Sequence, residues 1–245
     1  MDMVLLHGSW HGAWCWHKVV PRLEAAGHRV LVPDLPAHGT QWRWLRGRTT
    51  LHHMARAVCN LLDTLPEPAL LVAHSRGGIV ASTVAEMRSD KVAGCVYLAA
   101  YLLRDGERVA DYFRQDKDSL VRRHIQISRS TLTDALPPAA RQATLYADCD
   151  AADVALAQSL LTPEPSLPAL TRLRLTDKRY GRIPRHYIEL TQDCAITPAL
   201  QRRMVAQSPC ASVQHIEASH SAYFCQPVAL SAAILRVAAP QAPLG

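Results

Sequence analysis

The sequence predicts an α/β fold built on a mainly parallel sheet of about six strands. Short apolar runs alternate with amphipathic helical patterns over residues 3–103 and again over residues 183–245. Uninterrupted apolar runs such as "MVLLHG" and "ALLVAH" are typical of strands that are buried on both faces. A third observation is the change of pattern between Arg104 and Arg182, where strand signals stop and charges and prolines increase.

Each element of the first half follows from a local pattern. Apolar runs predict strands at 3–8, at 29–39 with its loop, at 69–74 and at 92–100. Apolar residues at helical spacing predict helices at 13–28, 49–65 and 77–89, of which the first closes near Gly27. Strand and helix therefore alternate, which is the order that produces a parallel sheet with helices on both faces.

The second half contains an insertion and then a return to alternation. Helical stretches at 137–148 and 151–161 stand in a region without strand signals, so residues 104–182 are expected to form a helical cap after the fourth strand. Strands at 185–190 and 211–218, with helices at 198–208 and 227–239, complete the sheet. The predicted organisation is a core domain of residues 1–103 and 183–245 that carries the cap.

The composition fits one globular domain with an elaboration. The chain has 245 residues, 49% of them hydrophobic, and no apolar run is long enough to span a membrane. Its beginning shows no secretory signal, so we expect a cytoplasmic protein without stable membrane association. The formal charge of +6 comes mostly from scattered arginines without a nucleic-acid-binding motif, so no nucleic-acid partner is expected. The oligomeric state is not indicated, and a homodimer is left open.

The seven cysteines indicate neither a disulfide framework nor a zinc site. Their number is odd and no CxxC spacing occurs, which favours reduced thiols. They are Cys15, Cys59, Cys95, Cys149, Cys194, Cys210 and Cys225.

The stretch "LLVAHSRGGIV" places a polar serine where a buried strand turns into a helix. Ser75 is flanked two residues away by Ala73 and Gly77, and small residues at these places permit the strained turn that exposes a nucleophile. A Ser- and Gly-rich turn without chemistry is the alternative interpretation. Because a serine hydroxyl reacts only when a base removes its proton, the residues that follow must decide between the two.

An acid and a histidine follow the serine in the chain order that such a turn requires. Asp193 comes after the fifth core strand and His220 after the sixth, so both side chains reach the same edge of the sheet as Ser75. Taken singly, Asp193 fits a turn or a helix cap, and His220 fits a loop histidine. Their joint occurrence favours a triad of Ser75, Asp193 and His220, with Asp105 after the fourth strand as the alternative acid.

Backbone N–H groups beside the serine are expected to form an oxyanion hole. One donor is Arg76, the residue after the nucleophile, and the other is Ser9 in the loop after the first strand. His7 and His11 in that loop raise the alternative of a metal site, but no carboxylate or cysteine completes one nearby. Serine chemistry needs no metal, so neither a metal nor a cofactor is expected.

Several of these segments together resemble a known family. They are "HGSWHGAWCW", "VPDLPAHG", "HSRGG", "LYADC", "YIELTQDCAITPALQ" and "SHSAYF". They are similar to the plant methylesterase and hydroxynitrile lyase branch of the α/β-hydrolases, and to bacterial carboxylesterases that include pyrethroid hydrolases. The resemblance covers nearly the whole chain. It implies the α/β-hydrolase fold, a triad of Ser75, Asp193 and His220, an oxyanion hole at Ser9 and Arg76, and an apolar active site under the cap.

Two places depart from the pattern of that family. Arg76 stands where many plant members carry an apolar residue, and its side chain is expected either to favour anionic substrates or to pack over the turn against an acidic or carbonyl partner. Segment 42–48 alternates Trp42 and Trp44 with arginines. This pattern fits either an entrance for acidic lipid or aromatic substrates, or a solvated loop whose tryptophans fold against the cap.

The expected function is that of a serine carboxylester hydrolase that acts on a small or medium hydrophobic ester through an acyl-enzyme. Gly8, Trp10 and Ser221 are expected to contact this substrate. In hydroxynitrile lyases of the resembled family a threonine takes the place of Gly8 and a lysine that of Ser221, so these two residues disfavour the alternative of cyanohydrin cleavage. A ligand receptor with an intact triad and slow turnover is an alternative from another class.

Overall fold

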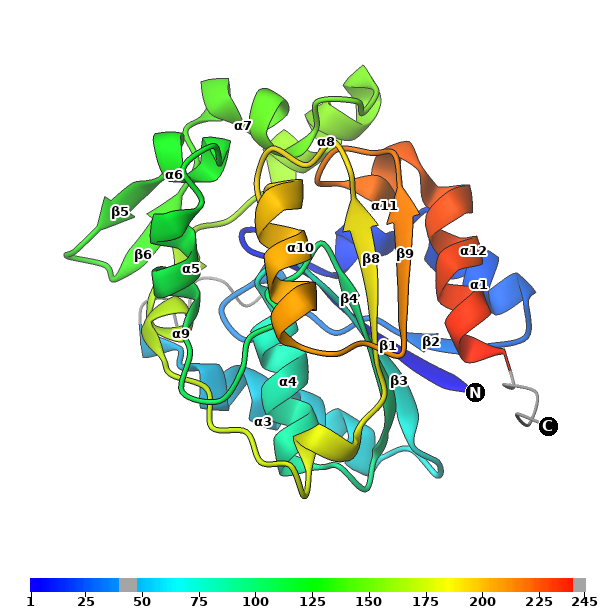
Figure 1. Cartoon of the computed structure of the whole chain (residues 1–245). Coiled ribbons are helices and arrows are strands. Elements are labelled where there is room, and N and C mark those ends of the chain that lie inside the picture. The colour runs from blue at the N-terminus through cyan, green and yellow to red at the C-terminus, as the bar shows by residue number, and fades with distance from the viewer. Residues whose placement is uncertain (40–47, 240–245) are drawn as a thin grey trace.

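The computed structural model describes residues 1–39 and 48–239 and centres on a sheet of six strands. The strand order is β2-β1-β3-β4-β8-β9, and every neighbouring pair is parallel (Figure 1). The strands are β1 (Asp2–Leu6), β2 (Arg29–Leu31), β3 (Ala69–His74), β4 (Val92–Leu98), β8 (Arg185–Leu190) and β9 (Ser212–Ile216). The predicted α/β fold with a parallel sheet is confirmed. Of the Trp- and Arg-rich segment 42–48, only Arg48 lies within the described residues.

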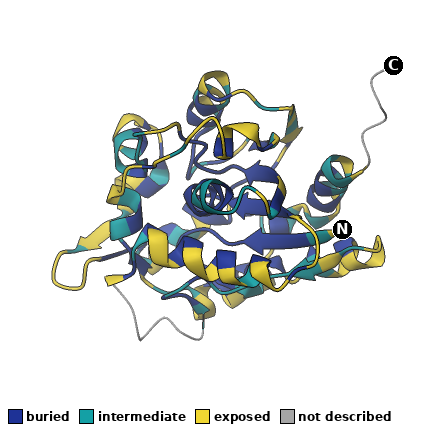
Figure 2. Cartoon of the chain, turned by 90° about the horizontal axis from the view of Figure 1, so that it is seen from below, coloured by how far each residue is buried: buried dark blue, intermediate teal, exposed yellow. Residues whose placement is uncertain are grey.

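Successive side chains of each strand point to opposite faces of the sheet, and helices cover both faces. One face is covered by α1 (Val20–Ala25) and α12 (Pro227–Ala238), and the other by α3 (Leu51–Asp63), α4 (Gly77–Met87) and α10 (Pro198–Gln207). In β1, Met3 and Leu5 pack into the first layer. Val4 and Leu6 pack into the second. Figure 2 shows strands of the sheet interior as buried and the outward sides of the helices as exposed, and the buried central strands are those with uninterrupted apolar runs.

The helix predicted over 13–28 is broken into two pieces. A single 3₁₀ turn, η1 (Ala13–Trp16), precedes α1, which begins at Val20. Pro21 lies in the first turn of α1, where a missing N–H is tolerated, but its ring would clash with the carbonyl of residue 17 in a continuous helix. The proline therefore sets the break, which helical periodicity alone does not reveal.

Most of the cap predicted over residues 104–182 lies at the edge of the sheet where the strands end, and its last part runs back to the start of β8 (Figure 1). Its helices are α5 (Val109–Gln115), α6 (Leu120–His124), α7 (Pro138–Leu145), α8 (Ala151–Leu160), α9 (Leu167–Leu170) and the 3₁₀ turn η4 (Tyr180–Arg182). It also contains an antiparallel sheet of β5 (Gln126–Ser128), β6 (Thr133–Ala135) and β7 (Glu164–Pro165). The cap is mainly helical, as expected, but the sequence does not reveal its three short strands, because strands of two or three residues are too short to show alternation.

The strand order places the loops after β1 and β3 beside a crevice. The chain runs from β1 outward to β2 at the edge and then crosses to β3 on the other side of β1. The connections after two neighbouring strands leave in opposite directions, which opens a crevice at the carboxyl ends of those strands. Ser9 follows β1 and Ser75 follows β3, so the fold itself brings these two residues together.

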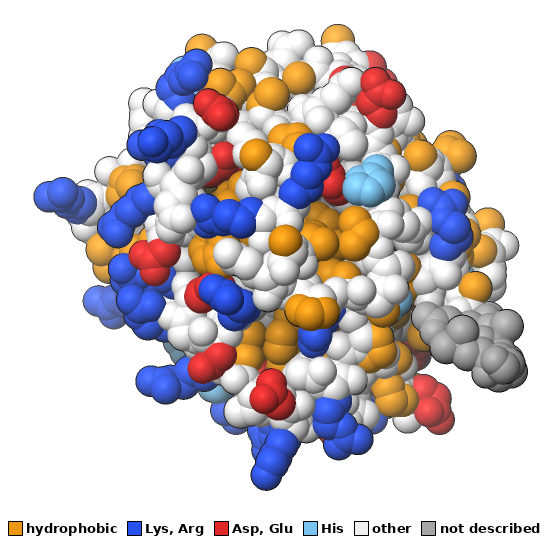
Figure 3. Space-filling view, viewed as in Figure 1, with side chains coloured by type: hydrophobic (Ala, Val, Ile, Leu, Met, Phe, Trp, Pro, Cys, Tyr) orange, Lys and Arg blue, Asp and Glu red, His pale blue; other side chains and the backbone are white. Residues whose placement is uncertain are grey.

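The surface carries charges of both signs. Figure 3 shows Lys and Arg side chains spread over one face of the molecule, with acidic and apolar side chains between them. This distribution agrees with a formal charge of +6 that comes from scattered arginines. Within residues 1–39 and 48–239, no helix has both the length and the apolar character needed to cross a bilayer.

Candidate active site

Ser75 occupies the turn between β3 and α4 in a backbone conformation that few side chains adopt. Its φ is +55°, in the left-handed region, where a residue with a Cβ carries a strain of about 1 kcal/mol or more. Hydrogen bonds hold this turn, since the N–H groups of Gly78 and Tyr101 donate to the Ser75 carbonyl at 3.2 and 3.0 Å. The turn lifts the Ser75 side chain out of the sheet and into the wall of a cavity.

Two glycines allow the loop after β1 to touch this turn. A Cβ on Gly8 would lie 2.7 Å from Ser75 Cβ, and a Cβ on Gly77 would lie 2.7 Å from the carbonyl oxygen of His7. Side chains do not tolerate such distances, so both positions need glycine. The first loop and the start of α4 thereby pack directly against each other.

Hydrogen bonds connect Ser75 to a buried carboxylate. Ser75 Oγ lies 3.1 Å from His220 Nε2, and His220 Nδ1 lies 2.7 Å from Asp193 Oδ2. His220 follows β9 and Asp193 follows β8, so three different strand ends supply the three side chains. All three residues are buried. This arrangement allows a proton to pass from Ser75 to His220 while Asp193 holds the other ring nitrogen as a donor.

The Asp193 carboxylate is fixed on its remaining sides. Its Oδ1 accepts from the N–H groups of Ala195 and Ile196 at 2.7 and 3.1 Å. Its Oδ2 also accepts from the Gln201 carboxamide at 3.3 Å. The alternative acid, Asp105, is exposed, and its carboxylate accepts from a backbone N–H of the cap instead.

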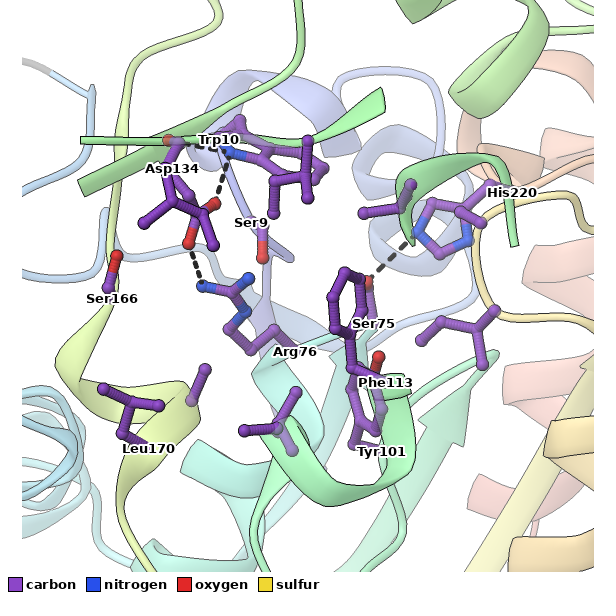
Figure 4. A pocket seen from close by; sticks show the side chains of 18 residues that line it. Ser9, Trp10, Ser75, Arg76, Tyr101, Phe113, Asp134, Ser166, Leu170 and His220 are labelled. Atoms are coloured by element: carbon purple, nitrogen blue, oxygen red, sulfur yellow. Dashed lines mark hydrogen bonds and ion pairs between the residues drawn. The ribbon is translucent and has the colours of Figure 1, made fainter. Parts of the chain in front are cut away.

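Ser75 and His220 line a cavity of about 770 Å³, counting the open space at its mouth (Figure 4). Its apolar lining comes mainly from the cap and includes Val109, Phe113, Val121, Ile125, Ile127 and Leu170. Ile127 and Leu170 are 65% and 51% exposed, so they mark the mouth. A cavity with this lining suits an apolar organic molecule.

Besides Ser75 and His220, three more residues predicted for the site lie in the cavity wall. Ser9 and Arg76, the expected oxyanion-hole residues, line it together with Ser75. Trp10, expected to contact substrate, lines it as well. Figure 4 shows Arg76 and Trp10 on the side of the cavity away from His220.

Two other predicted contacts lie outside this wall. Gly8 and Ser221 are not among the residues that line the cavity, and their contact with a substrate stays a prediction. Gly8 lies behind the turn, where Ser75 fills the space of a side chain. Ser221 is fully buried, and its hydroxyl donates to Tyr223 Oη at 3.1 Å. Sequence spacing does not reveal this, because both residues adjoin others that do reach the cavity.

The Arg76 guanidinium connects the turn to the cap. Its Nη1 lies 3.3 Å from Asp134 Oδ2 in β6 and 3.4 Å from Glu164 Oε1 in β7 (Figure 4 shows the first pair). The three side chains are nearly buried, with exposures of 11%, 5% and 3%. The expectation of an acidic partner for Arg76 is therefore confirmed, and the guanidinium is not a free cation for anionic substrates.

Trp10 and His38 extend this cluster around Glu164. The backbone N–H of Trp10 donates to Glu164 Oε2 at 3.0 Å, and His38 Nε2 lies 2.6 Å from the same oxygen. Burial opposes the charged form of Glu164, but His38 and Arg76 together lower its pKa to about 2. Burial also opposes a charged His38, yet Glu164 raises its pKa above the ordinary value. The cluster thus pairs two buried acids with two buried basic side chains.

Two histidines of the loop after β1 are neutral. Burial lowers the pKa of His7 to about 4 and that of His11 to about 3. His7 Nε2 accepts from the N–H of Leu35 at 3.0 Å, as only a neutral ring can. Neutral His11 donates from Nδ1 to the Ser9 carbonyl at 2.6 Å and accepts from the Tyr146 hydroxyl at 2.7 Å. His11 therefore ties the loop that carries Ser9 to the cap.

Sequence reasoning missed four residues of this site. Tyr101 lines the cavity directly after β4, and Gln201 supports the carboxylate beside the imidazole. Asp134 and Glu164 pair with Arg76. Arg76 itself is the one signal for these two acids, because its side chain needs a partner, but the sequence does not tell which of the many acids in the cap supply it.

One cluster in the described part of the chain could supply metal ligands, and it lies outside the cavity. The ligand atoms of Asp148, Cys149 and Cys225 lie within 4.8 Å of one another. Three side chains fall short of a closed four-ligand zinc site, and the Asp148 carboxylate already accepts two hydrogen bonds from Ser219.

A comparison with protein families agrees with this geometry. A profile described as "Alpha/beta hydrolase family" matches residues 3–233. The chain belongs to the alpha/beta hydrolase family. The resemblance drawn from its sequence motifs is thereby confirmed.

This alpha/beta hydrolase is similar to plant methylesterases and to a bacterial pyrethroid hydrolase. It is 33% identical to putative methylesterase 11, chloroplastic, of Arabidopsis thaliana over 96% of the chain, but it spans 63% of the length of that relative. It is 31% identical to salicylic acid-binding protein 2 of Nicotiana tabacum, with 96% of both chains covered. The crystal structure of a pyrethroid hydrolase from Sphingobium faniae matches with a TM-score of 0.89 and 28% identity, over 99% of this chain and 98% of that one.

Proposed function

We propose that this alpha/beta hydrolase is a serine carboxylesterase that cleaves small or medium hydrophobic esters. The observation that carries the proposal is the hydrogen-bonded series of Ser75, His220 and Asp193, which ends at the wall of an apolar cavity. The names of its relatives, methylesterase and pyrethroid hydrolase, support the same type of reaction.

In the first half of the proposed reaction, His220 removes the proton from Ser75 Oγ as this oxygen attacks the ester carbonyl carbon. The carbonyl oxygen becomes an oxyanion, for which the backbone N–H groups of Ser9 and Arg76 are the proposed donors. His220 then gives its proton to the departing alcohol, and the acyl group stays on Ser75. Asp193 stabilises the imidazolium that exists between the two transfers.

In the second half, water takes the place of the alcohol. His220 removes a proton from water as the water oxygen attacks the acyl carbon. The bond to Ser75 Oγ then breaks, and this oxygen regains its proton from His220. The products are a carboxylic acid and an alcohol.

His7 supports the proposed role of the Ser9 N–H. His7 Nδ1 donates to the Gly8 carbonyl at 2.9 Å. The Gly8 carbonyl and the Ser9 N–H belong to one planar trans peptide, in which they point in opposite directions. Because His7 holds the carbonyl on one side, the Ser9 N–H points to the other side. His7 is therefore proposed as a positioning residue for the oxyanion hole.

A panel of aryl and alkyl esters with graded acyl lengths, including methyl salicylate and a pyrethroid, tests the proposal. We expect turnover of several members by the wild type and no turnover above background by Ser75→Ala, because the removed oxygen is the covalent attacker. Turnover that survives in Ser75→Ala would remove Ser75 from the mechanism. Saturable binding of ligands without turnover of any ester would favour the receptor alternative.

A further inference from the structure

Cys149 and Cys225 converge on one carbonyl oxygen. Cys149 lies in the cap just before α8, and Cys225 ends α11 (Ala222–Cys225) in the core, beside α8 (Figure 1). Their thiols lie 4.0 and 3.6 Å from the carbonyl oxygen of Ser221, and the two sulfur atoms lie within 4.8 Å of each other. Both cysteines are half-buried, so a small reagent reaches them without unfolding of the chain.

The same stretch of the cap holds the loop of His220 on both sides. The Asp148 carboxylate accepts from the Ser219 N–H at 2.8 Å and from the Ser219 hydroxyl. Cys149 contacts the Ser221 carbonyl. Ser219 and Ser221 are the chain neighbours of His220, so a change at the two thiols reaches the imidazole through a single residue.

The other cysteines serve as an internal comparison. Three of them, Cys15, Cys59 and Cys95, are buried in the core. Cys194 and Cys210 are half-buried like the pair, but each thiol contacts the carbonyl two residues before it. Exposure alone therefore does not distinguish Cys149 and Cys225, whereas their approach to each other across two elements does.

We propose that Cys149 and Cys225 form a reversible disulfide between the cap and the core by exchange with a small-molecule disulfide, and that this bond lowers ester turnover. Disulfides that form in a reducing compartment are rare and usually transient, and the proposed bond is of this kind. The bridge would close a loop of 77 residues, from 149 to 225. It would also withdraw both thiol donors from the Ser221 carbonyl.

The exchange proceeds in two steps through a mixed disulfide. The thiolate of one cysteine of the pair attacks one sulfur of the reagent and releases a small thiolate. The other cysteine then loses its proton, attacks the protein sulfur of the mixed disulfide and releases the second small thiol. Two protein thiols are oxidised while one small disulfide is reduced to two thiols.

The small number of ligands disfavours a divalent metal as the occupant of this cluster. Metal binding requires both sulfurs as thiolates at the same time. The third ligand, Asp148, is already engaged by Ser219. A disulfide needs neither a third ligand nor two thiolates at the same time.

The full chain treated with oxidised glutathione, and then with an alkylating reagent, tests the proposal by mass spectrometry. We expect an intact mass lower by about 2 Da before alkylation and a cross-link between the peptides of Cys149 and Cys225. We expect the midpoint of thermal unfolding to rise by about 5 °C, because the bridge restricts the unfolded chain. Ester turnover should fall several-fold and return after dithiothreitol.

Matched variants separate the pair from the remaining thiols. Cys149→Ser and Cys225→Ser should keep their turnover under the oxidant, and Cys210→Ser should respond as the wild type does. Glutathione attached singly to each thiol, a bridge to another cysteine, or no bridge would overturn the proposal. A Cys149–Cys225 bridge with unchanged turnover would overturn its link to His220. The mass measurement does not depend on catalysis, so its failure is distinguishable from failure of the proposed esterase activity.

Discussion

Gln201 donates a hydrogen bond to Asp193 on the oxygen that also accepts from His220. Gln201 is fully buried, and it is held in turn by the Ile196 carbonyl at 2.7 Å and the Leu190 N–H at 3.1 Å. It does not line the cavity. Gln201 therefore orients the carboxylate from α10 without reaching a substrate.

Replacement of Gln201 by Met should lower kcat by about 10-fold and leave KM nearly unchanged, because the carboxylate loses one fixed donor and the cavity is untouched. Steady-state kinetics on a responsive ester measures this split. The same replacement in an Asp193→Asn background should have little further effect, since Gln201 acts through that carboxylate. Equal losses in both backgrounds would show that Gln201 has only a general structural role.

Asp193→Asn should lower kcat by about 10³-fold or more, because the imidazole loses the acceptor that fixes its tautomer and stabilises its charge. Asp105→Asn is the matched control and should retain wild-type kinetics, since the Asp105 carboxylate is exposed and bonds to the cap backbone. The opposite pattern in the two variants would assign the acid to Asp105.

Arg76→Met should lower the free energy of unfolding by about 3 kcal/mol, because it leaves Asp134 and Glu164 buried with one cation fewer. Urea denaturation at pH 7 measures the loss. The double variant Arg76→Met/Asp134→Asn should recover part of it, since one of the unpaired carboxylates is gone. Arg129→Met, at an exposed arginine, should change stability by less than about 0.5 kcal/mol. Equal effects at Arg76 and Arg129 would contradict the importance of the buried cluster.

Acid should destabilise the fold through its neutral histidines. Burial lowers the pKa of His7 to about 4 and of His11 to about 3, whereas both take up protons near 6.5 in the unfolded chain. The unfolded chain therefore binds more protons between these values, and the free energy of unfolding should fall as the pH falls from 6.5 toward 4. Each histidine contributes about 1.4 kcal/mol per pH unit. His38 contributes in the opposite sense, because its raised pKa stabilises the fold below pH 6.5 and this contribution is lost at higher pH.

Urea denaturation at pH 6.5, 5.5 and 4.5 measures that slope. His11→Gln should reduce it by about one proton. His17→Gln, at an exposed histidine, should leave it unchanged. A slope that is identical in His11→Gln and the wild type would show that His11 is not the buried neutral group described above.

Mandelonitrile should be cleaved no faster than the buffer background. The lyases that the sequence resembles use a threonine and a lysine at the places of Gly8 and Ser221. Here a side chain at Gly8 would collide with Ser75, and Ser221 is a buried residue that itself carries no charge to compensate a departing cyanide. Release of benzaldehyde is measured beside hydrolysis of an activated ester. Saturable, Ser75-dependent release without ester turnover would contradict the esterase proposal.

The sequence predicts those parts of the molecule that depend on local signals. Apolar runs mark strands that are buried on both faces. In a parallel sheet the residues after successive strands meet at one edge, so the sequence predicts that Ser75, Asp193 and His220 lie together. The strands β5, β6 and β7 could not be predicted, because two or three residues show no periodicity.

The charged cluster shows a second limit. Asp134 and Glu164 lie 58 and 88 positions after Arg76, and nothing in their immediate neighbours distinguishes them from the exposed acids of the cap. Their roles depend on how β6 and β7 are placed over the turn. Ser221 shows the same limit in reverse, since its position beside His220 suggests a role in the cavity but its hydroxyl faces Tyr223 in the core. Long-range packing decides both cases.

The cluster of Arg76, His38, Asp134 and Glu164 makes the core and the cap depend on each other, so that neither can be replaced alone. Its two cations belong to the core and its two anions to the cap. A chimera that joined this core to a cap without these two acids would bury the Arg76 cation without a counter-ion, and the reciprocal chimera would leave two buried carboxylates unpaired. Loss of one partner from a buried pair costs about 3–5 kcal/mol, which is a large part of the stability of a whole domain. We therefore expect that an exchange of the cap on this core requires matched replacements at Arg76, Asp134 and Glu164, whereas replacements among the apolar residues of the cavity wall break no ion pair.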